Sequence, residues 1–152
     1  MFEDRLVTEY IGKNADKIEN EKVNWVAALL GQEIGPIWFF YRKSWLLGIG
    51  FIIVSLIVSK ITSALGISKA YYVMFFIYLF SADKLYLWDV RRKVRKIMQD
   101  NSNLDEQQLL ELVKEKGGTS TVAAVIYSVV FIAFIAILYA FVFSSMMALM
   151  SL

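Results

Sequence analysis

The stretch "VAAVIYSVVFIAFIAILYAFVF", from Val122 to Phe143, is 22 consecutive uncharged and mostly apolar residues. A helix of about 20 such residues is long enough to cross the hydrocarbon core of a bilayer. No charged residue occurs anywhere between Gly117 and Leu152. The stretch therefore predicts a C-terminal transmembrane helix within residues 119–152, and it decides the class of protein to which the chain belongs.

Two further apolar segments come earlier in the chain. Sixteen uncharged residues run from Ser44 to Ser59, and the apolar pattern resumes after Lys60, whose long side chain can reach the headgroups. We expect a first transmembrane helix over residues 44–66. Residues 70–88 start with thirteen uncharged residues and predict a second one, so that residues 44–88 form a transmembrane hairpin.

The composition supports a membrane protein and argues against an enzyme. Hydrophobic residues make up 58% of the chain and charged residues 20%, against about 45–50% and about 25% in ordinary globular domains. The chain has no cysteine and no histidine, which excludes thiol nucleophiles, histidine bases and the commonest metal ligands. We expect no catalytic residue, no metal site and no cofactor. A net charge of +2 is too small to indicate nucleic-acid binding.

The N-terminal segment, residues 1–43, is expected to be amphipathic and interfacial. Phe2, Leu6 and Tyr10 recur every four residues in a polar segment, which predicts a short amphipathic helix. Residues 23–41 are apolar but are interrupted by "GQEIGP", and Glu33 would be costly in mid-membrane. We interpret this part as interfacial or re-entrant. The alternative is a buried amphipathic helix of a soluble domain.

Residues 89–118 are predicted to form a basic loop with one short helix, over residues 103–116. Asn103 is the expected N-cap and Gly117 the expected C-cap. The leucines and valine of this helix form one apolar stripe, so we expect the helix to lie on a partner or on the headgroup surface.

Charge placement predicts the orientation. Arg42 and Lys43 precede the first span and "RRKVRK" at residues 91–96 follows the second, whereas the hairpin between them carries only Lys60 and Lys69. Positively charged loops stay in the cytoplasm. We therefore expect a multi-pass protein of the inner cell membrane, with the N-terminus and the 89–118 loop in the cytoplasm and the C-terminus outside.

Aromatic and basic residues beside the predicted spans are typical of a membrane interface. Aromatic rings favour headgroup depth and bases favour an anionic leaflet. In one interpretation these residues only anchor the protein and set its topology. In the other they also bind anionic lipid. The candidate interface residues are Trp38, Tyr41, Arg42, Lys43, Trp45, Trp88, Arg91, Arg92, Lys93, Arg95 and Lys96.

Asp83 and Lys84 are the charged residues inside the predicted second span. Ionisable residues within a membrane are candidates for function. Lys84 can reach the cytoplasmic surface, and Asp83 is expected to face another helix or a cation such as Arg42. One alternative is a transport or proton-relay role for Asp83. The other is that the span ends earlier, so that Asp83 is simply exposed.

Four motifs occur in order: "EYIGKNADKIE" (Glu9–Glu19), "VNWVAALLG" (Val23–Gly31), "GPIWFFYRKSW" (Gly35–Trp45) and "KLYLWDVRRKVRKI" (Lys84–Ile97). Together they make the chain resemble a widespread bacterial family of small integral membrane proteins of unknown function. The chain departs from the family pattern at Ser44–Trp45, where Met-Tyr is usual, and at Asp83–Lys84. The resemblance implies a membrane topology and does not imply an activity.

The sequence thus predicts an all-α membrane protein with three transmembrane helices and cytoplasmic or interfacial amphipathic helices. We expect a non-enzymatic accessory or scaffold protein that binds a partner protein or anionic lipid at the cytoplasmic face. A membrane-protein partner or a homo-oligomer is expected, and no nucleic acid. The alternatives are an oligomeric transport or permeabilising unit that uses Asp83, and an immunity or stress-tolerance protein.

Overall fold

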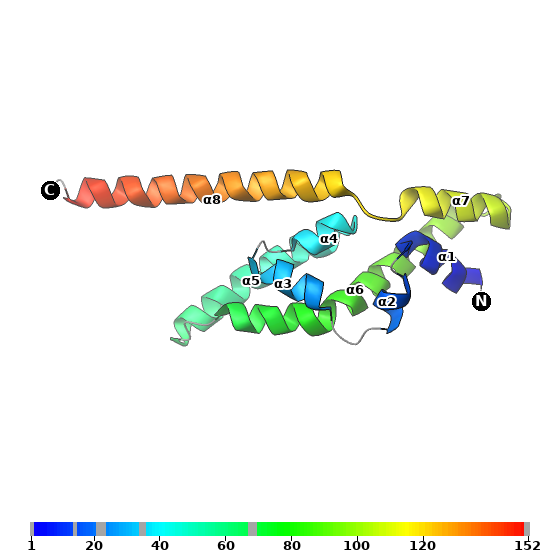
Figure 1. The fold of residues 1–152 in the computed structure, drawn as a ribbon, viewed down its shortest axis with the longest axis horizontal. Helices are drawn as coiled ribbons and strands as arrows, with labels where there is room; N and C mark the ends of the chain where they lie inside the picture. The colour runs from blue at the N-terminus through cyan, green and yellow to red at the C-terminus, as the bar shows by residue number, and fades with distance from the viewer. Residues whose placement is uncertain (1, 14, 21–23, 34–35, 67–69, 151–152) are drawn as a thin grey trace.

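The computed structural model describes residues 2–13, 15–20, 24–33, 36–66 and 70–150, and every regular element in these ranges is a helix (Figure 1). The fold class is therefore all-α, as predicted. The helices are α1 (Phe2–Ile11), α2 (Ala15–Asn20), α3 (Trp25–Glu33), α4 (Ile37–Tyr41), α5 (Trp45–Ala64), α6 (Ala70–Asp100), α7 (Glu106–Lys116) and α8 (Thr121–Met150).

Helix α6 is the element on which the other helices assemble. It is 31 residues long and contacts α1, α2, α3, α5 and α7. Its buried residues recur every fourth position, so that they form one continuous stripe along the helix. Small and large side chains share the stripe: Met74, Tyr78, Ala82, Tyr86, Val90 and Val94. Hydrophobic contact along this stripe joins the two ends of the molecule into one core.

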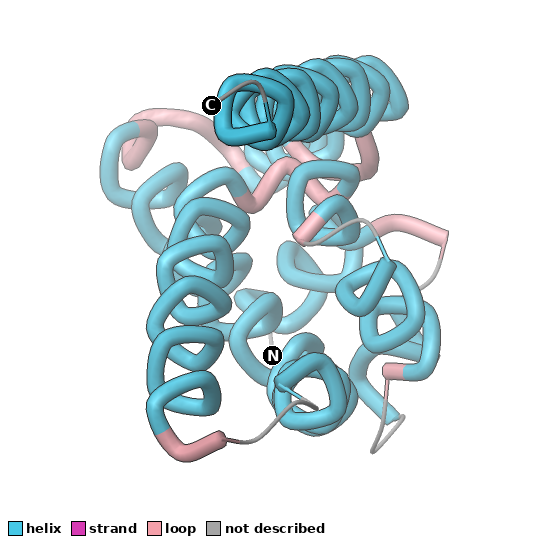
Figure 2. The backbone as a smooth tube through the Cα atoms, turned by 90° about the vertical axis from the view of Figure 1, so that its left-hand side faces the viewer, coloured by secondary structure: helices cyan, strands magenta, loops and turns pink. Residues whose placement is uncertain are grey.

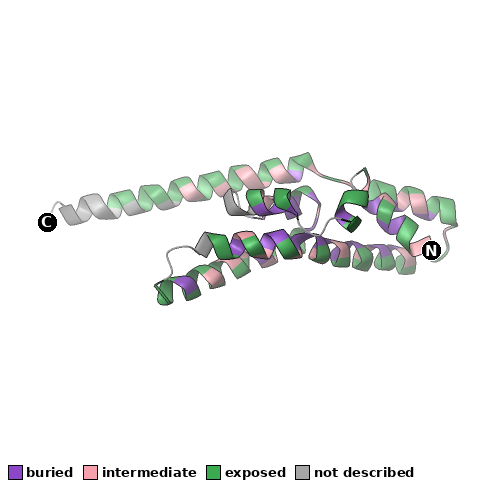
Figure 3. Cartoon of the chain, turned by 60° about the horizontal axis from the view of Figure 1, so that its bottom comes forward, coloured by how far each residue is buried: buried purple, intermediate pink, exposed green. Residues whose placement is uncertain are grey.

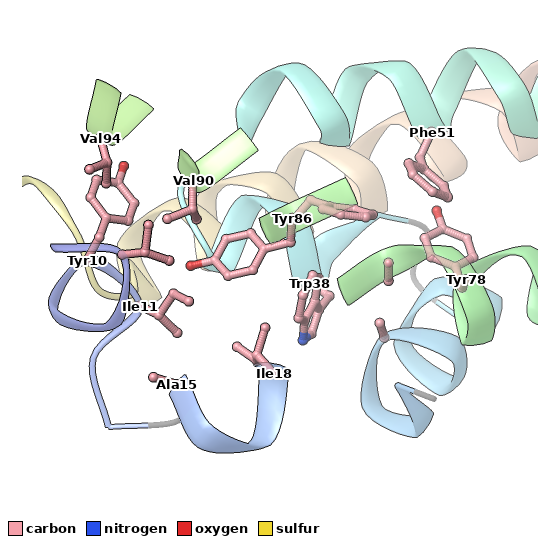
Figure 4. Close-up of a cluster of buried hydrophobic side chains, with 14 of the residues drawn as sticks. Tyr10, Ile11, Ala15, Ile18, Trp38, Phe51, Tyr78, Tyr86, Val90 and Val94 are labelled. Atoms are coloured by element: carbon pink, nitrogen blue, oxygen red, sulfur yellow. The ribbon is translucent and has the colours of Figure 1, made fainter. Parts of the chain in front are cut away.

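An aromatic cluster joins α4 and α5 to the first half of α6 (Figure 4). The ring of Phe51 lies 4.7 Å from that of Phe39 and 4.6 Å from that of Tyr78, measured between centroids. The rings of Trp38 and Tyr86 meet edge-to-face at 5.4 Å. Buried aromatic pairs of this kind contribute about 0.5–1.5 kcal/mol beyond the burial of their area, so this cluster fixes how the short helix α4 sits on α6.

The predicted N-terminal amphipathic helix is confirmed as α1. Leu6, Val7, Tyr10 and Ile11 are buried, and the helix packs between α6 and α7. The side of α1 that carries Asp4, Arg5 and Thr8 is exposed.

Helix α7 differs in two ways from the prediction. Its N-cap is Asp105 and not Asn103, because the Asp105 carboxylate accepts from the Gln108 backbone N–H at 2.8 Å and completes a capping box. Its stripe covers α1 rather than a partner or a headgroup surface, and Leu109 and Val113 are buried there. The predicted C-cap, Gly117, is confirmed.

Helix α8 lies along one side of the protein and extends beyond the other helices (Figures 1, 2 and 3). Its first turns pack on α4, where the rings of Phe40 and Tyr127 stack with their centroids 4.4 Å apart. Farther along, large apolar side chains point away from the protein, and Ile137 and Phe141 are 68% and 71% exposed. Such a surface is stable only where an apolar medium or another chain covers it.

Two helices in the described residues are long and apolar enough to cross a membrane. One is α5, at Trp45–Ala64, and the other lies in the range Glu106–Phe141, whose apolar part belongs to α8. They lie where the sequence predicts the first span, residues 44–66, and the C-terminal span, within residues 119–152. The connection between the first two predicted spans begins at Gly66, which has the left-handed φ of 69°, and residues 67–69 lie outside the described residues.

The predicted second span, residues 70–88, is not one of these two helices. The loop predicted to begin at residue 89 is helical at its start. Helix α6 continues unbroken to Asp100, because the sequence from Ala70 to Asp100 contains no glycine or proline and its charged part is rich in strong helix formers. The basic residues 91–96 therefore lie on a helix and not in a loop. The loop itself is confined to residues 101–105.

The segment at residues 23–41 forms two short helices, α3 and α4, rather than one continuous span. Ala27 and Ala28 of α3 are completely buried against α6, whereas Trp25 and Leu29 are more than half exposed on the other side. The side chain of Glu33, on which the interfacial interpretation depended, lies outside the described part of the chain.

The link between α7 and α8 crosses α1 at close range, and this crossing gives a prediction. A Cβ at Gly117 would lie 2.3 Å from the Tyr10 carbonyl oxygen, and the Gly118 N–H donates to the same oxygen at 2.7 Å. Because the obstacle is backbone, Gly117→Ala is expected to lower the free energy of unfolding by about 1–3 kcal/mol or more. Thermal unfolding in detergent measures the loss.

Gly50→Ala is the matched control, since a Cβ there meets nothing within 4 Å and the position is helical. This variant is expected to be unchanged or slightly more stable. Equal melting temperatures for Gly117→Ala and the wild type would contradict the close crossing.

Candidate functional site

The predicted interface residues separate into buried and exposed groups in the folded protein. Around the corner between α4 and α5, Trp38 and Arg42 are buried, Lys43 is half-buried, and Tyr41 and Trp45 are exposed. Arg42 is only 6% exposed. Arg42 therefore does not lie on the open surface, because the α4 corner turns its side chain toward the rings of Trp38 and Tyr86. The contact of Arg42 and Lys43 with headgroups stays a prediction.

Arg42 lies between two aromatic rings. Its guanidinium carbon is 5.7 Å from the centroid of Trp38 and 5.6 Å from that of Tyr86. Cation–π contacts contribute about 0.5–2 kcal/mol each, but a ring does not satisfy a directional N–H. The Nε and Nη1 groups are buried and have no hydrogen-bond partner within the described part of the chain.

Lys43 connects the α4–α5 corner to the end of α7. Its φ of 56° is in the left-handed region, which costs a non-glycine residue about 1–2 kcal/mol. In this conformation its ammonium donates to the carbonyl of Gly117 at 2.6 Å. A cation at the C-terminal end of a helix is favoured by the helix dipole, so the contact offsets part of the backbone strain.

The centre of this corner is a buried carboxylate, Asp89, in the middle of α6. Asp89 is 3% exposed, accepts a hydrogen bond from the Ser44 hydroxyl at 2.7 Å and forms an ion pair with the Lys93 ammonium at 2.6 Å. Lys93 also donates to the Lys43 carbonyl at 3.0 Å. We call Lys43, Ser44, Asp89 and Lys93 the polar junction. Lys93, predicted as a lipid-facing base, is thus engaged within the protein.

Tyr10 packs beside the polar junction from α1. Burial raises the pKa of its hydroxyl to about 12, and the nearby Tyr86 and Asp89 add to the shift. Tyr10 is therefore neutral at physiological pH and brings no second negative charge toward Asp89.

Asp83 lies one helical turn and a half before Asp89 on α6 and contacts the beginning of α3. It is buried, and its carboxylate accepts from the Asn24 side-chain amide at 2.5 Å. Asn24 also caps α3, because its side-chain oxygen accepts from the Ala27 N–H at 2.7 Å. As predicted, Asp83 faces another helix. Its contact with a capping residue favours a structural role, and a transport role stays an alternative prediction. Lys84 is exposed, and its reach to the cytoplasmic surface stays a prediction.

A cavity of about 450 Å³ lies between α3, α4 and the start of α8, with further lining from α2 and α6. Its charged lining residues are Lys17, Arg42 and Asp83. Arg42 and Asp83 contribute opposite charges, Trp38 and Tyr41 contribute aromatic surface, and Leu30 contributes an aliphatic wall. The cavity is amphipathic, which suits a ligand that has a charged end and an apolar end.

The exposed bases form a separate surface on the outer side of α6. Trp88 lies on this surface and is 54% exposed. The guanidinium carbon of Arg92 lies 5.8 Å from the centroid of the Trp88 ring. A hollow of about 860 Å³ follows this side of the helix. We call this surface the basic face, and its residues are Lys84, Trp88, Arg91, Arg92, Arg95 and Lys96. Arg95 also pairs with Glu3 of α1 at 2.8 Å.

Three residues of the site were not predicted. Ser44, Asp89 and Asn24 are polar residues beside apolar runs, and each is buried with a partner far away in the sequence. Asn24 gave a usable signal, because an asparagine directly before an apolar helix is a typical N-cap. Asp89 gave none, since its partner Ser44 is 45 residues away. Within the described residues, no group of three or more potential ligands could hold a metal ion.

The family model for proteins of unknown function named DUF2628 matches residues 5–92. The chain belongs to this family. The match confirms the resemblance to an uncharacterised family, and it includes α1–α5 and α6 as far as Arg92, while α7 and α8 lie beyond it. No curated protein and no solved structure matches the chain.

The polar junction gives a prediction about coupling. Removing the charge of one partner leaves the other buried or half-buried without compensation, which costs about 1–3 kcal/mol. Asp89→Asn and Lys93→Gln are each expected to lower the free energy of unfolding. Because the two groups form one pair, the double variant is expected to lose less than the sum of the single variants.

Chemical unfolding of the four proteins in detergent measures this coupling, which is expected to be about 0.5–3 kcal/mol. Arg95→Gln with Glu3→Gln is the matched control, because that pair is exposed and is expected to couple by less than about 1 kcal/mol. If the double variant loses as much unfolding free energy as the two single variants together, the ion pair between Asp89 and Lys93 is contradicted.

Proposed function

We propose that this DUF2628 protein is a three-span inner-membrane protein that acts as an accessory or scaffold protein at the cytoplasmic face, where its basic face binds anionic lipid and a partner protein. The observation that carries the proposal is the position of the basic face. It follows the apolar half of α6 directly, and its first residues are Lys84 and the exposed Trp88. An aromatic ring followed by clustered bases is the pattern of a membrane–water boundary.

The exposed apolar surface of α5 and α8 supports a membrane location. Leu46 and Leu56 of α5 are 60% and 64% exposed, and much of α8 is exposed along its length (Figure 3). The 20 residues of α5 rise about 30 Å, which equals the hydrocarbon thickness. In water this surface would favour aggregation, whereas lipid covers it without cost.

The packing of α6 on α5 supports the third span. The chain turns after Ala64, and the first half of α6 returns along α5 (Figure 1). If α5 crosses the bilayer, this half of α6 crosses it in the opposite direction. Phe76 and Phe80 on its outer side are more than half exposed, which suits contact with lipid. The charged second half of α6 then extends out of the membrane.

The two ends of the molecule support the predicted orientation. The turn after α5 and the C-terminal end of α8 lie at one end of the long axis, and the N-terminus and α7 lie at the other (Figure 1). The basic half of α6 belongs to the second end. The positive-inside rule then places this second end in the cytoplasm.

The absence of cysteine allows a direct test of this topology, because a single introduced cysteine is the sole thiol to be labelled. We expect Ser63→Cys and Ser144→Cys to react with a membrane-impermeant maleimide in intact spheroplasts. Ser102→Cys, in the loop after α6, is expected to react only after the membrane is opened. All three serines are exposed in the folded protein.

Mass shift of the purified protein measures the labelling, and a denatured sample of each variant controls for reactivity. Labelling of Ser102→Cys from the outside would contradict the orientation. Labelling of Ser63→Cys and Ser144→Cys from opposite sides would contradict the number of spans.

The binding role of the basic face is tested by neutralisation. Each base near an anionic leaflet contributes about 1 kcal/mol, so the variant with Arg91, Arg92, Arg95 and Lys96 changed to Gln is expected to lose anionic lipid and its protein partner. Crosslinking in native membranes followed by purification of the full chain measures both, with lipid and protein mass spectrometry as the readout.

The matched control changes the same charge elsewhere, with Arg5, Lys13, Lys114 and Lys116 changed to Gln. These four bases are exposed and lie off the basic face. The proposal predicts that the control variant keeps the anionic lipid and the protein partner that the basic-face variant loses. An equal yield of lipid and of crosslinked protein from both variants would overturn the role of the basic face.

A further inference from the structure

The geometry points to a second, specific binding site in which buried Arg42 holds the phosphate group of one phospholipid, with the headgroup inside the cavity between α3, α4 and α8. This inference rests on the membrane location proposed above. It differs from the proposed role of the basic face, which is an open surface and would attract many lipids without choosing one.

The first argument is the unsatisfied chemistry of Arg42. The Arg42 residue is only 6% exposed, and its Nε and Nη1 groups are buried with no hydrogen-bond partner within the described part of the chain. Buried charges are normally paired and buried N–H groups are normally bonded. The rings of Trp38 and Tyr86 stabilise the charge from their faces. The Tyr86 hydroxyl is a neighbouring acceptor, but it is neutral and a single oxygen cannot satisfy the whole planar fork of N–H groups, so the site still favours an anionic acceptor.

The second argument is the fit of the acceptor. The guanidinium presents its N–H groups as a planar fork, which matches two oxygens of a phosphate or carboxylate. The cavity that Arg42 lines measures about 450 Å³, a size that holds a headgroup and the beginning of its acyl chains. Lys17, on the rim of this cavity, adds a second positive charge.

The third argument is the apolar side of the cavity, which favours a lipid over a free ion. Val26 and Leu30 of α3, Ile37 of α4 and Ala124 of α8 form this side. The neighbouring outer face of α3 carries exposed Trp25 and Leu29. In the proposed membrane location this face is in contact with lipid, so acyl chains can leave the cavity along it without entering water.

Asp83 also lines the cavity and sets a limit on the ligand. Its carboxylate is already bonded to the Asn24 amide, and its negative charge opposes a ligand of high negative charge. A phosphodiester carries a single negative charge, which matches the single positive charge of Arg42. Phospholipids with one phosphodiester, such as phosphatidylglycerol, fit this limit.

The test is the number of phospholipids held by the full chain, measured by native mass spectrometry after purification in mild detergent. The wild type is expected to retain one phospholipid. Arg42→Gln is expected to reduce this retention at least about tenfold, because a bidentate charge-assisted bond is lost. The matched control is Arg92→Gln, since Arg92 also lies on an aromatic ring but is exposed on the basic face.

A second variant keeps the test decisive if Arg42→Gln does not fold. Ala124→Phe leaves Arg42 in place and narrows the cavity, and it is expected to lose the lipid. Ala133→Phe adds the same ring to an exposed position of α8 and is expected to keep it. Retention of the phospholipid by both Arg42→Gln and Ala124→Phe would overturn the inference.

Calorimetry on delipidated protein distinguishes the source of the phosphate, with dihexanoyl-phosphatidylglycerol and inorganic phosphate as the two probes. Arg42-dependent binding of the short-chain lipid supports the phospholipid. If inorganic phosphate alone binds in an Arg42-dependent way, the phosphate site stands but the phospholipid is not its ligand. If neither probe binds, both the phosphate site and the phospholipid are ruled out. Maleimide labelling and the basic-face variant report on the proposed function independently, so either idea can fail alone.

Discussion

The buried carboxylate of Asp89 is the constraint on which the arrangement of the corner depends. A carboxylate that is removed from water must be paired and hydrogen-bonded, and Asp89 meets this need with Ser44 from the start of α5 and Lys93 from its own helix. Ser44 occupies the N-cap position of α5, yet its hydroxyl bonds to Asp89 rather than to its own helix. The start of α5 is thereby fixed to the middle of α6.

The consequences of this pairing extend to both ends of the chain. With the corner fixed, the Lys43 ammonium reaches the end of α7 and the Ser120 N–H reaches the carbonyl of Tyr41. These contacts set where α8 begins. The same corner turns Arg42 inward onto Trp38 and Tyr86, so one polar junction positions a helix start, a helix end and a buried cation.

Helix α6 carries two environments in one continuous element. Its buried stripe keeps the same period throughout, from Tyr78 in the apolar half to Val94 in the charged half. Its outer side changes from phenylalanine to arginine at Trp88. The helix is therefore uniform where it meets the protein and divided where it meets the surroundings.

The sequence by itself determined the helical class, the positions of α1, α5 and α8, the cap at Gly117 and the family, because each of these follows from local periodicity, from local composition or from motifs in order. It also indicated which residues are basic and aromatic beside the apolar segments. Only the tertiary structure decided which of them face outward. Arg91 and Arg92 are exposed, whereas Arg42 and Lys93 have partners or rings inside the protein. The reason is physical: the fate of a charged side chain depends on partners that folding supplies. The ring of Tyr86 against Arg42, and the Ser44 hydroxyl and Lys43 carbonyl that complete the surroundings of Asp89 and Lys93, all come from more than forty residues away. No local pattern encodes that distance.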